Sequence, residues 1–360
     1  MSGQNQASLI ALDWGTSSLR AYLHDCAGTV ITSRESADGV AAIASRAQTD
    51  AALPFRAAFE RLCGDWLGAV PKLPTIASGM IGSRQGWLEA PYLDCPADLR
   101  RLGEHLLRVD TLAGRPFAIV PGLKQTQPSN RADVMRGEET QLLGVLATQP
   151  TITAQHTAPN ADEPNADEPS ADEPSADVPS ADVPYADAPN AKQAALYVMP
   201  GSHSKWVQLD GTQVKGFSTF MTGELYSAIA AHTIVGRLFA GGADRFDAAV
   251  FCAAVDDGAE QAEQLTAWLF SIRAAGLLGQ IASQSLASRL SGLLIGAELA
   301  GARQRFGWFD QIHLIGSALL TERYRIALAH RGHRAVIHEA NAAAKGLFLI
   351  AQQAGLLALS

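Results

Sequence analysis

The chain has 360 residues, of which 47% are hydrophobic and 18% charged, so it has the composition of a globular protein and enough length for two domains. No apolar run approaches the roughly 18 to 20 residues that a membrane span requires, which excludes a membrane protein. The formal net charge is −8, but nine acidic and no basic side chains fall within residues 160–189, and the near-neutral remainder has no Lys/Arg run of the kind that binds nucleic acid.

The cysteines and the N-terminus both predict a cytoplasmic protein. The first residues are polar, and only a very short apolar run precedes Asp13, which is not the pattern of a secretory signal. The cysteines lie far apart in the sequence and form no Cys-x-x-Cys motif, which fits a reducing compartment. They are Cys26, Cys63, Cys95 and Cys252.

The first predicted unit is a strand, a small polar loop, a second strand, a tight turn and a third strand. The strands are expected at residues 9–12, 19–23 and 29–32, and the loop at residues 13–18. Gly15 would let the backbone approach an anion, and the N–H groups and hydroxyls of Thr16, Ser17 and Ser18 could donate to it, while Asp13 could hold a hydrated Mg²⁺. The alternative is an ordinary hairpin.

A five-residue repeat occupies residues 160–189, where Pro recurs at every fifth position six times. Proline at this spacing blocks helices and sheet ladders, and the alanines and acids between offer nothing to bury. We therefore expect an extended acidic insertion at residues 151–191 that interrupts a domain without forming one. An acidic docking segment is the alternative.

The strand–loop–strand pattern occurs again after the repeat, with strands expected at residues 195–199, 206–209 and 212–215. The second loop, residues 200–205, contains Gly201, the hydroxyls of Ser202 and Ser204, and the cation of Lys205. Two such units predict two similar domains whose polar loops face each other across a cleft; two unrelated hairpins are the alternative. The chain contains no Walker motif and no dinucleotide-binding glycine motif.

The remaining segments predict helices at residues 222–238, 259–270, 286–304, 318–330 and 340–357, interleaved with a strand at residues 311–315. The whole is the pattern of an α/β protein. Ligands collect at the carboxyl ends of strands in such sheets, so Gly316 and Ser317 are a third candidate contact. The small residues at 342–346 offer a face on which another helix could pack closely; a plain alanine-rich helix is the alternative.

Several blocks together resemble the two-domain sugar kinases of the acetate and sugar kinase, heat-shock ATPase and actin superfamily, and most closely the 2-dehydro-3-deoxygalactonokinase family. The similarity covers nearly the whole chain apart from the repeat. The blocks are Leu12-Asp-Trp-Gly-Thr-Ser-Ser-Leu-Arg20, Ser78-Gly-Met-Ile-Gly-Ser-Arg-Gln-Gly-Trp87 with Pro91-Tyr92, Met135-Arg-Gly-Glu-Glu-Thr-Gln141, Pro200-Gly-Ser-His-Ser-Lys-Trp206, and Leu314-Ile-Gly-Ser317 with Arg323-Tyr324.

This resemblance implies roles for particular residues. It places Asp13 at the Mg-ATP phosphates, Gly201 to Ser204 in the second phosphate loop, and Gly316 and Ser317 near the nucleotide. Glu138 would accept the proton of the attacking hydroxyl, although the related enzymes usually have an aspartate there. Glu139 beside it and Asp133 are alternative bases, and a helix first turn is the structural alternative for both glutamates.

Two residues are implied on the substrate side. Arg84 could bind the carboxylate of a keto-deoxy sugar acid in a bidentate fork, and Trp87 could provide an apolar wall for the sugar. Their alternatives are a surface ion pair and core packing. The histidines show no zinc-site spacing, so we expect no metal other than the Mg²⁺ that accompanies the nucleotide.

The sequence therefore predicts an α/β chain of two actin-like, ribonuclease-H-like domains around an ATP cleft, residues 1–130 and residues 131–360. The reaction implied by the resemblance is ATP-dependent phosphorylation of 2-dehydro-3-deoxy-D-galactonate at its C6 hydroxyl, with Mg²⁺. The expected partner is this small sugar acid, and the oligomeric state is left open, a homo-oligomer included. The alternatives are a kinase for another small sugar or sugar acid and a sugar-sensing protein on the same fold.

Overall fold

The computed structural model describes residues 6–45, 52–109, 115–126, 131–148, 194–239, 245–307, 309–338 and 342–357; the predicted repeat insertion lies outside them. The first sheet has the strand order β3-β2-β1-β4-β8-β7. Its first three strands are antiparallel, and β4 and β8 continue it in parallel. The strands are β1 (Ala7–Trp14), β2 (Leu19–Asp25), β3 (Val30–Ser36), β4 (Thr75–Ser78), β7 (Leu107–Arg108) and β8 (Phe117–Ile119).

A second sheet repeats this arrangement. Its order is β15-β14-β11-β12-β13-β6, with β11, β12 and β13 antiparallel and β14 and β15 parallel to β11. The strands are β6 (Ala97–Asp98), β11 (Ala194–Met199), β12 (Ser204–Asp210), β13 (Gln213–Phe220), β14 (Gln311–Leu314) and β15 (Arg334–Ile337). An antiparallel three-strand meander whose first strand is followed by two parallel strands is the ribonuclease-H-like order, so the predicted actin-like α/β fold is confirmed.

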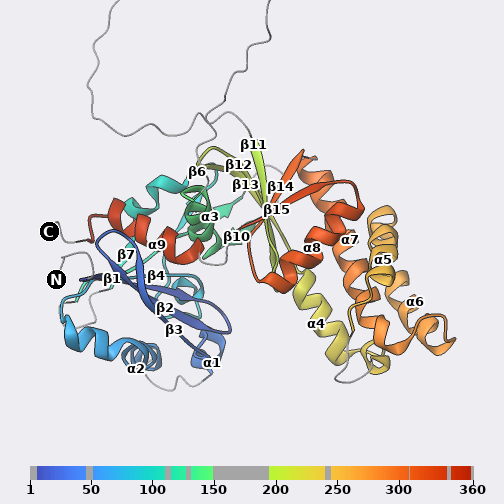
Figure 1. The fold of residues 1–360 in the computed structure, drawn as a ribbon, viewed down its shortest axis with the longest axis horizontal. Coiled ribbons are helices and arrows are strands. Elements are labelled where there is room, and N and C mark those ends of the chain that lie inside the picture. The colour runs from blue at the N-terminus through green and yellow to red at the C-terminus, as the bar shows by residue number, and fades with distance from the viewer. Residues whose placement is uncertain are drawn as a thin grey trace, which may run out of the picture.

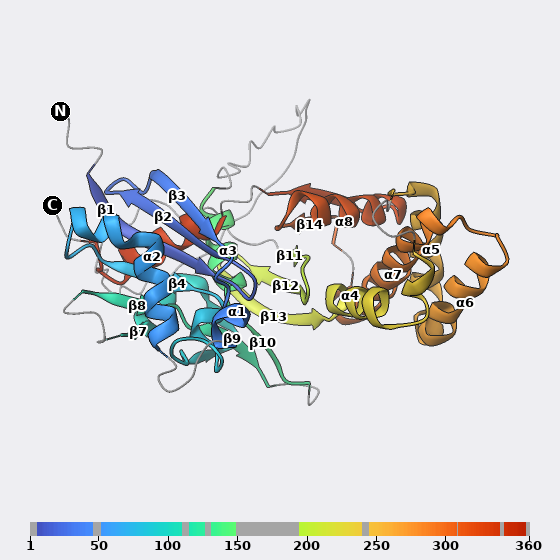
Figure 2. The same cartoon turned by 90° about the horizontal axis from the view of Figure 1, so that it is seen from below.

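A small third sheet lies between the two large ones, with the order β10-β9-β5. Its strands are β5 (Tyr92–Asp94), β9 (Gly122–Gln125) and β10 (Asp133–Met135). The helices are α1 (Val40–Ala44), α2 (Leu53–Ala69), α3 (Glu138–Leu146), α4 (Thr222–His232), α5 (Ala248–Glu260), α6 (Leu265–Leu277), α7 (Leu286–Phe306), α8 (Ala318–His330) and α9 (Ala342–Gln353). Figures 1 and 2 show α4 to α8 gathered on the side of the second sheet that is remote from β1.

Strand β1 is buried on both faces, because successive side chains of a strand point to opposite sides. Ile10 and Leu12 pack toward the core under α2, with Phe59 and Phe117 among its members. Leu9 and Ala11, on the opposite face of the strand, pack toward α3 and α9. The near-continuous apolar run of β1 thus produces a central strand covered on both sides.

Helices α3 and α9 approach each other closely beside β1, as Figure 1 shows. A Cβ on Gly144 would lie 1.9 Å from the carbonyl oxygen of Ala342, and one on Gly346 would lie 1.9 Å from that of Thr140. The prediction that the small residues at 342–346 form a face for another helix is therefore confirmed. Both helices come from residues beyond 130 and pack on the first sheet; the division of the chain at residue 130 remains a prediction.

Most predicted elements are present, and three helices differ; one is the helix predicted at 340–357, because α9 ends at Gln353. The predicted helix at 259–270 is wrong in its bounds, because α5 ends at Glu260 and α6 begins at Leu265. Asp247 starts α5 earlier than expected, as its carboxylate accepts the N–H of Val250 at 3.1 Å and caps the helix. The predicted helix at 222–238 is too long: α4 ends at His232, because Thr233 adopts an extended backbone with φ −115° and ψ 168°. None of the helices in the described ranges is long and apolar enough to cross a membrane.

Candidate active site

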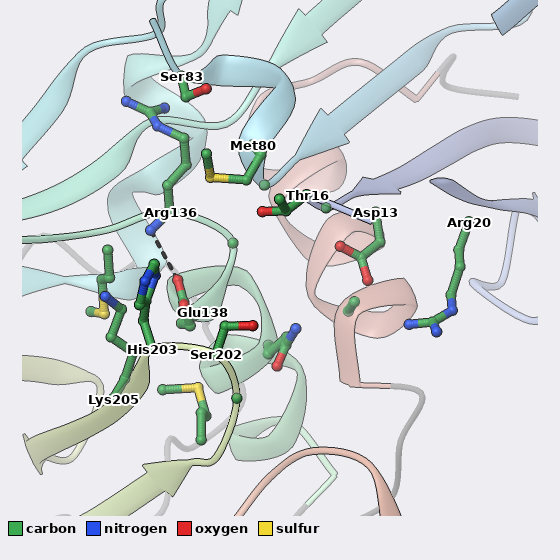
Figure 3. A pocket seen from close by; sticks show the side chains of 18 of the residues that line it. Asp13, Thr16, Arg20, Met80, Ser83, Arg136, Glu138, Ser202, His203 and Lys205 are labelled. Atoms are coloured by element: carbon green, nitrogen blue, oxygen red, sulfur yellow. Dashed lines mark hydrogen bonds between the residues drawn. The ribbon is translucent and has the colours of Figure 1, made fainter. Parts of the chain in front are cut away.

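A cavity of about 1150 Å³ lies where the strand-connecting loops of the two large sheets meet. The polar loops predicted from the two repeated units both line it, as do the segment after β4, the residues around the start of α3, and the segment after β14. Figure 3 shows Asp13, Glu138 and Ser202 among its side chains. Of the predicted site residues, it is lined by Asp13, Gly15, Thr16, Arg84, Glu138, Gly201, Ser202, Gly316 and Ser317.

Asp13 lies near the end of β1, between Arg20 of β2 and Ser78 of β4 in the sheet register. Burial raises the pKa of its carboxyl, the charges of Glu138 and Glu35 raise it further, and Arg20 opposes them. Burial is the largest of these effects, so the ionised form of Asp13 is costly in this position. A hydrated divalent cation beside it would stabilise that form.

The first loop is held in place by α1. The backbone N–H of Val40 donates to the carbonyl of Gly15 at 3.0 Å, and that of Ala41 donates to Thr16 at 3.1 Å. Gly15 and Thr16 line the cavity. Ser17 is exposed and is not among the lining residues, so the structure does not bring this predicted phosphate contact to the cavity.

The second loop is fixed by the first turn of α4. A Cβ on Gly223 would lie 2.3 Å from the carbonyl oxygen of Gly201, and the N–H of Glu224 donates to the carbonyl of Ser202 at 2.9 Å. The Glu224 carboxylate also lies 2.5 Å from Nε2 of His203, which lines the cavity. These contacts hold the second loop against the first turn of α4.

Ser204 does not reach the cavity. It is fully buried, and its hydroxyl lies 2.8 Å from the hydroxyl of Tyr324 in α8. Tyr324 donates to Glu298 of α7 at 2.7 Å, and Glu298 also accepts from Nε1 of Trp206 at 2.7 Å and from the hydroxyl of Thr222. Glu298 thus joins four elements behind the second polar loop, a role that the sequence analysis missed because those elements are far apart in sequence.

The structure separates the two adjacent glutamates of α3. Glu138 lines the cavity, and its Oε2 accepts the backbone N–H of Arg136 at 2.9 Å. Glu139 is fully buried, and its two carboxyl oxygens lie 2.8 and 2.9 Å from the N–H of Gly137. Burial, and then the charge of Glu138, raises the pKa of Glu139 to about 8. Only Glu138 faces the space where a substrate could bind.

Asp133, the third candidate base, has another function in the structure. Its carboxylate accepts the backbone N–H of Thr219 at 2.7 Å and the Thr219 hydroxyl at 2.6 Å, which ties β10 to β13. It is absent from the cavity lining.

The start of α3 requires two glycines in contact. Gly137 and Gly79 have φ of 109° and 91°, in the left-handed region that favours glycine. A Cβ on Gly137 would lie 3.1 Å from Cα of Gly79, and one on Gly79 would lie 2.8 Å from the carbonyl oxygen of Trp14. The glycines therefore let the segment after β4, the start of α3 and the end of β1 meet at the cavity.

The two predicted substrate residues differ in position. Arg84 is exposed and lines the cavity. Trp87 is buried in the core, with its ring centroid 5.0 Å from that of Phe117, and is not a lining residue. Core packing, the structural alternative for Trp87, describes its place in the fold.

Other polar residues of the cavity were given no role in the sequence analysis. They include Arg20, Ser83, Tyr92, Arg136, Gln141 and His203. Lys205, noted only as a cation of the second loop, also lines the cavity and donates to the carbonyl of Val134 and the hydroxyl of Thr219. Arg136 and Gln141 stand in the same sequence block as Glu138, which was the available signal.

A second cavity of about 320 Å³ adjoins the first through Gly201 and Ser202. Its wall includes Phe246 and Arg323, whose guanidinium carbon lies 3.6 Å from the Phe246 ring centroid. A partly apolar cavity that shares lining residues with the second polar loop could receive a nucleoside. Among the described residues, no group of three or more His, Cys, Asp or Glu side chains could hold a metal ion by itself.

Two ribonuclease-H-like sheets with paired polar loops on a shared cavity define an actin-like phosphotransferase. The family model for 2-keto-3-deoxy-galactonokinase matches residues 13–159 and 183–350, which leaves out part of the repeat. The chain belongs to this 2-keto-3-deoxy-galactonokinase family.

Individual relatives agree with this membership. The chain is 37% identical to "Probable 2-dehydro-3-deoxygalactonokinase DgoK1" of Rhizobium meliloti (strain 1021), with 89% of each chain covered. It is 33% identical to the 2-dehydro-3-deoxygalactonokinase of Escherichia coli (strain K12), with 91% of each covered. A crystal structure assigned as a 2-dehydro-3-deoxygalactonokinase protein from Sinorhizobium meliloti has a TM-score of 0.75 and 35% identity, covering 96% of this chain and 98% of its own.

Proposed function

We propose that the chain transfers the γ-phosphoryl group of ATP to the C6 hydroxyl of 2-dehydro-3-deoxy-D-galactonate. The observation that carries the proposal is that, in a chain of this family, the Glu138 carboxylate lines the same cavity as both phosphate loops. A base, an anion-binding backbone and a sugar-acid pocket in one place are the requirements for this transfer.

In the proposed reaction, Glu138 accepts the proton of the C6 hydroxyl as the bond from that oxygen to the γ-phosphorus forms. The bond from the γ-phosphorus to the bridging β,γ-oxygen breaks, and ADP leaves with that oxygen. The backbone N–H group at Gly201 and the hydroxyls of Thr16 and Ser202 stabilise the charge of the transferring group. Glu138 is kept in position by the N–H of Arg136 at 2.9 Å.

The residues present fit Mg²⁺. The Asp13 carboxylate and the Thr16 hydroxyl supply the hard oxygen atoms that this ion prefers, and burial, which raises the pKa of Asp13, makes its ionised form costly unless a cation is near. Asp13 would hold the ion through its hydration shell. When bound, Mg²⁺ would neutralise phosphate charge.

The nucleoside would occupy the second cavity, so that the triphosphate passes Gly201 and Ser202 into the first. Gly316 and Ser317 line the first cavity just before α8 and would contact the phosphates nearest the nucleoside. Arg84, exposed on the same wall as Ser83, would meet the acid end of the substrate.

An acceptor panel in a coupled ADP-release assay tests the proposal. The acceptors are 2-dehydro-3-deoxy-D-galactonate, its C4 epimer 2-dehydro-3-deoxy-D-gluconate, D-galactonate and D-galactose. We expect the first to give the highest kcat/KM, with ³¹P NMR showing a phosphate ester on C6. A higher kcat/KM for another acceptor would assign the enzyme a different sugar acid, and no ADP with any acceptor would contradict a kinase of this class.

A further inference from the structure

Arg136 is a buried arginine at the wall of the first cavity, directly before α3. Its side chain is only 8% exposed, and Nη2 donates to the carbonyl of Ala90 at 2.7 Å. Its Nε and Nη1 atoms are shielded from solvent and have no hydrogen-bond partner among the described residues. The guanidinium lies 4.2 Å from the centroid of the Tyr92 ring, which fixes its plane. Burying a cation with unsatisfied donors is costly, so the arrangement calls for an anion.

The carboxylates nearby do not supply that anion. Glu138 accepts the backbone N–H of Arg136, and Glu139 accepts the N–H of Gly137; neither forms an ion pair with the Arg136 guanidinium within the described part of the chain. The Arg136 guanidinium therefore has no carboxylate hydrogen-bonded to it among the described residues.

Ser83 provides a second unsatisfied donor beside Arg136. It is also 8% exposed, and its hydroxyl has no partner among the described residues. It follows Gly82, where a Cβ would lie only 2.8 Å from Nη1 of Arg136, so the segment after β4 runs directly along the guanidinium. Both residues line the cavity, and Figure 3 shows the Arg136 guanidinium beside Ser83.

We propose that Arg136 and Ser83 form a subsite for the carboxylate of a 2-keto sugar acid. This inference rests on the proposed function, which it extends by naming the group that reads the acid. Nη1 and the second N–H of Nη2 can hold the two oxygens of a carboxylate in an end-on fork, and the Ser83 hydroxyl can donate to one of them.

The arrangement of the cavity agrees with such a subsite. In the view of Figure 3, the Glu138 carboxylate lies between the Arg136 guanidinium and Ser202. A six-carbon acid with its C1 carboxylate at Arg136 would extend its other end toward the base and the phosphate loop. Arg84 is exposed, so its charge is screened by water. In this arrangement it gives the carboxylate a second, weaker contact at the rim of the cavity.

The test compares the acid 2-dehydro-3-deoxy-D-galactonate with its uncharged amide, by calorimetric Kd and by steady-state KM. Arg136→Gln should weaken binding of the acid by about 10- to 100-fold and binding of the amide by less than about 3-fold. Arg136→Lys should recover only part of the loss, because an ammonium lacks the fork. Ser83→Ala should weaken binding of the acid by about 3- to 10-fold, again more than binding of the amide.

Arg289→Gln is the matched control. Arg289 is also mostly buried and lies over an aromatic ring, that of Trp268 at 5.6 Å, but its charge is paired with Asp257 at 2.6 Å and it is outside both cavities. Its loss should lower Tm and leave the ratio of acid to amide affinity unchanged.

Equal penalties on acid and amide in Arg136→Gln would overturn the carboxylate subsite while the kinase activity of the unaltered protein stands. A parent protein that phosphorylates neither compound would instead overturn the proposed function. If Arg136→Gln does not fold, as judged by circular dichroism, Arg136→Lys and Ser83→Ala decide between the same two outcomes.

Discussion

Asp13 and Glu138 are two carboxylates in one cavity that are assigned different tasks. Asp13 lies at the end of a buried strand, where burial raises the pKa of its carboxyl, and Glu138 lies at the first position of α3 with one oxygen on a backbone N–H. A buried carboxylate whose ionised form needs a cation suits the proposed metal, whereas one fixed by a backbone donor at the cavity suits the proposed proton transfer.

Asp13→Asn should lower kcat by roughly 10²-fold or more, because it keeps the size of the side chain but removes the charge that attracts hydrated Mg²⁺. Initial rates over a Mg²⁺ titration measure this. Asp25→Asn is the control, since Asp25 belongs to the same hairpin and its carboxylate only accepts the N–H groups of Ala27 and Thr29 at 2.9 and 2.8 Å. A near-normal kcat in Asp13→Asn at ordinary Mg²⁺ concentrations would show that Asp13 does not hold the metal and serves only in the hairpin.

Glu138→Gln should lower kcat by roughly 10²- to 10⁴-fold, the range for loss of a general base, with little change in the Kd of ATP. Glu139→Gln should have a much milder effect on kcat, because the Glu139 side chain is fully buried and points away from the cavity onto Gly137. Single-turnover kinetics separate the chemical step from binding. If Glu139→Gln lowered kcat more than Glu138→Gln, Glu139 would be the general base.

At the scale of elements, the start of α3 should carry a pH dependence of stability. The pKa of Glu139 is raised from 4.5 to about 8 in the folded protein, so between these values the unfolded chain ionises this carboxyl while the folded chain keeps it protonated. Unfolding is therefore increasingly favoured as the pH rises from about 4.5 toward 8, and the effect levels off above 8.

Glu139→Gln removes this titration, so its Tm relative to the unaltered protein should increase with pH across that window, by a few degrees. Thermal unfolding at half-unit pH steps measures it. Glu104→Gln, an exposed glutamate whose pKa is lowered by Arg101, should show no such rise. A Tm difference that stays constant from pH 5 to 8 would contradict the buried, protonated carboxyl.

The packing of the four elements behind the second polar loop should depend on Glu298. Glu298→Leu leaves the donors of Trp206, Thr222 and Tyr324 without their acceptor, so Tm should fall by several degrees. Because Trp206 follows the proposed phosphate loop and Tyr324 lines the proposed nucleoside cavity, KM for ATP should rise by about 3- to 10-fold. KM for the sugar acid should stay unchanged, and Glu298→Gln, which keeps an acceptor, should lie between the two. Equal changes in both KM values would mean a general loss of structure.

At the scale of the whole molecule, residues 160–189 should be dispensable. Their composition offers nothing to bury, and the family match omits residues 160–182, so the fold is specified by the sequence on either side. A deletion joined by a short Gly/Ser linker should keep Tm and kcat within about twofold. A folded but inactive deletion variant would instead give the repeat a function.

The sequence by itself determined the fold class and the loops. Short alternating or apolar runs, small polar loops and tight turns recur twice in the chain, and each of these signals is local, so the positions of β1 to β3 and β11 to β13 follow from it. The same holds for α8, whose bounds match the prediction, because its start follows directly from a strand and a Gly-Ser pair.

Only the tertiary structure decided which side chains of those loops face the cavity. Neighbours such as Glu138 and Glu139, or Ser202 and Ser204, have the same local pattern, but one of each pair is buried by contacts with distant elements: Glu139 at the junction of α3 with the segment after β4, Ser204 by Tyr324 of α8. Trp87 packs in the core against Phe117. The Arg136 guanidinium lies over the Tyr92 ring, and both Arg136 and Ser83 have buried donors without a partner among the described residues. Burial and the supply of hydrogen-bond partners are set by long-range packing, so they decide the chemistry of a residue that its own segment leaves open.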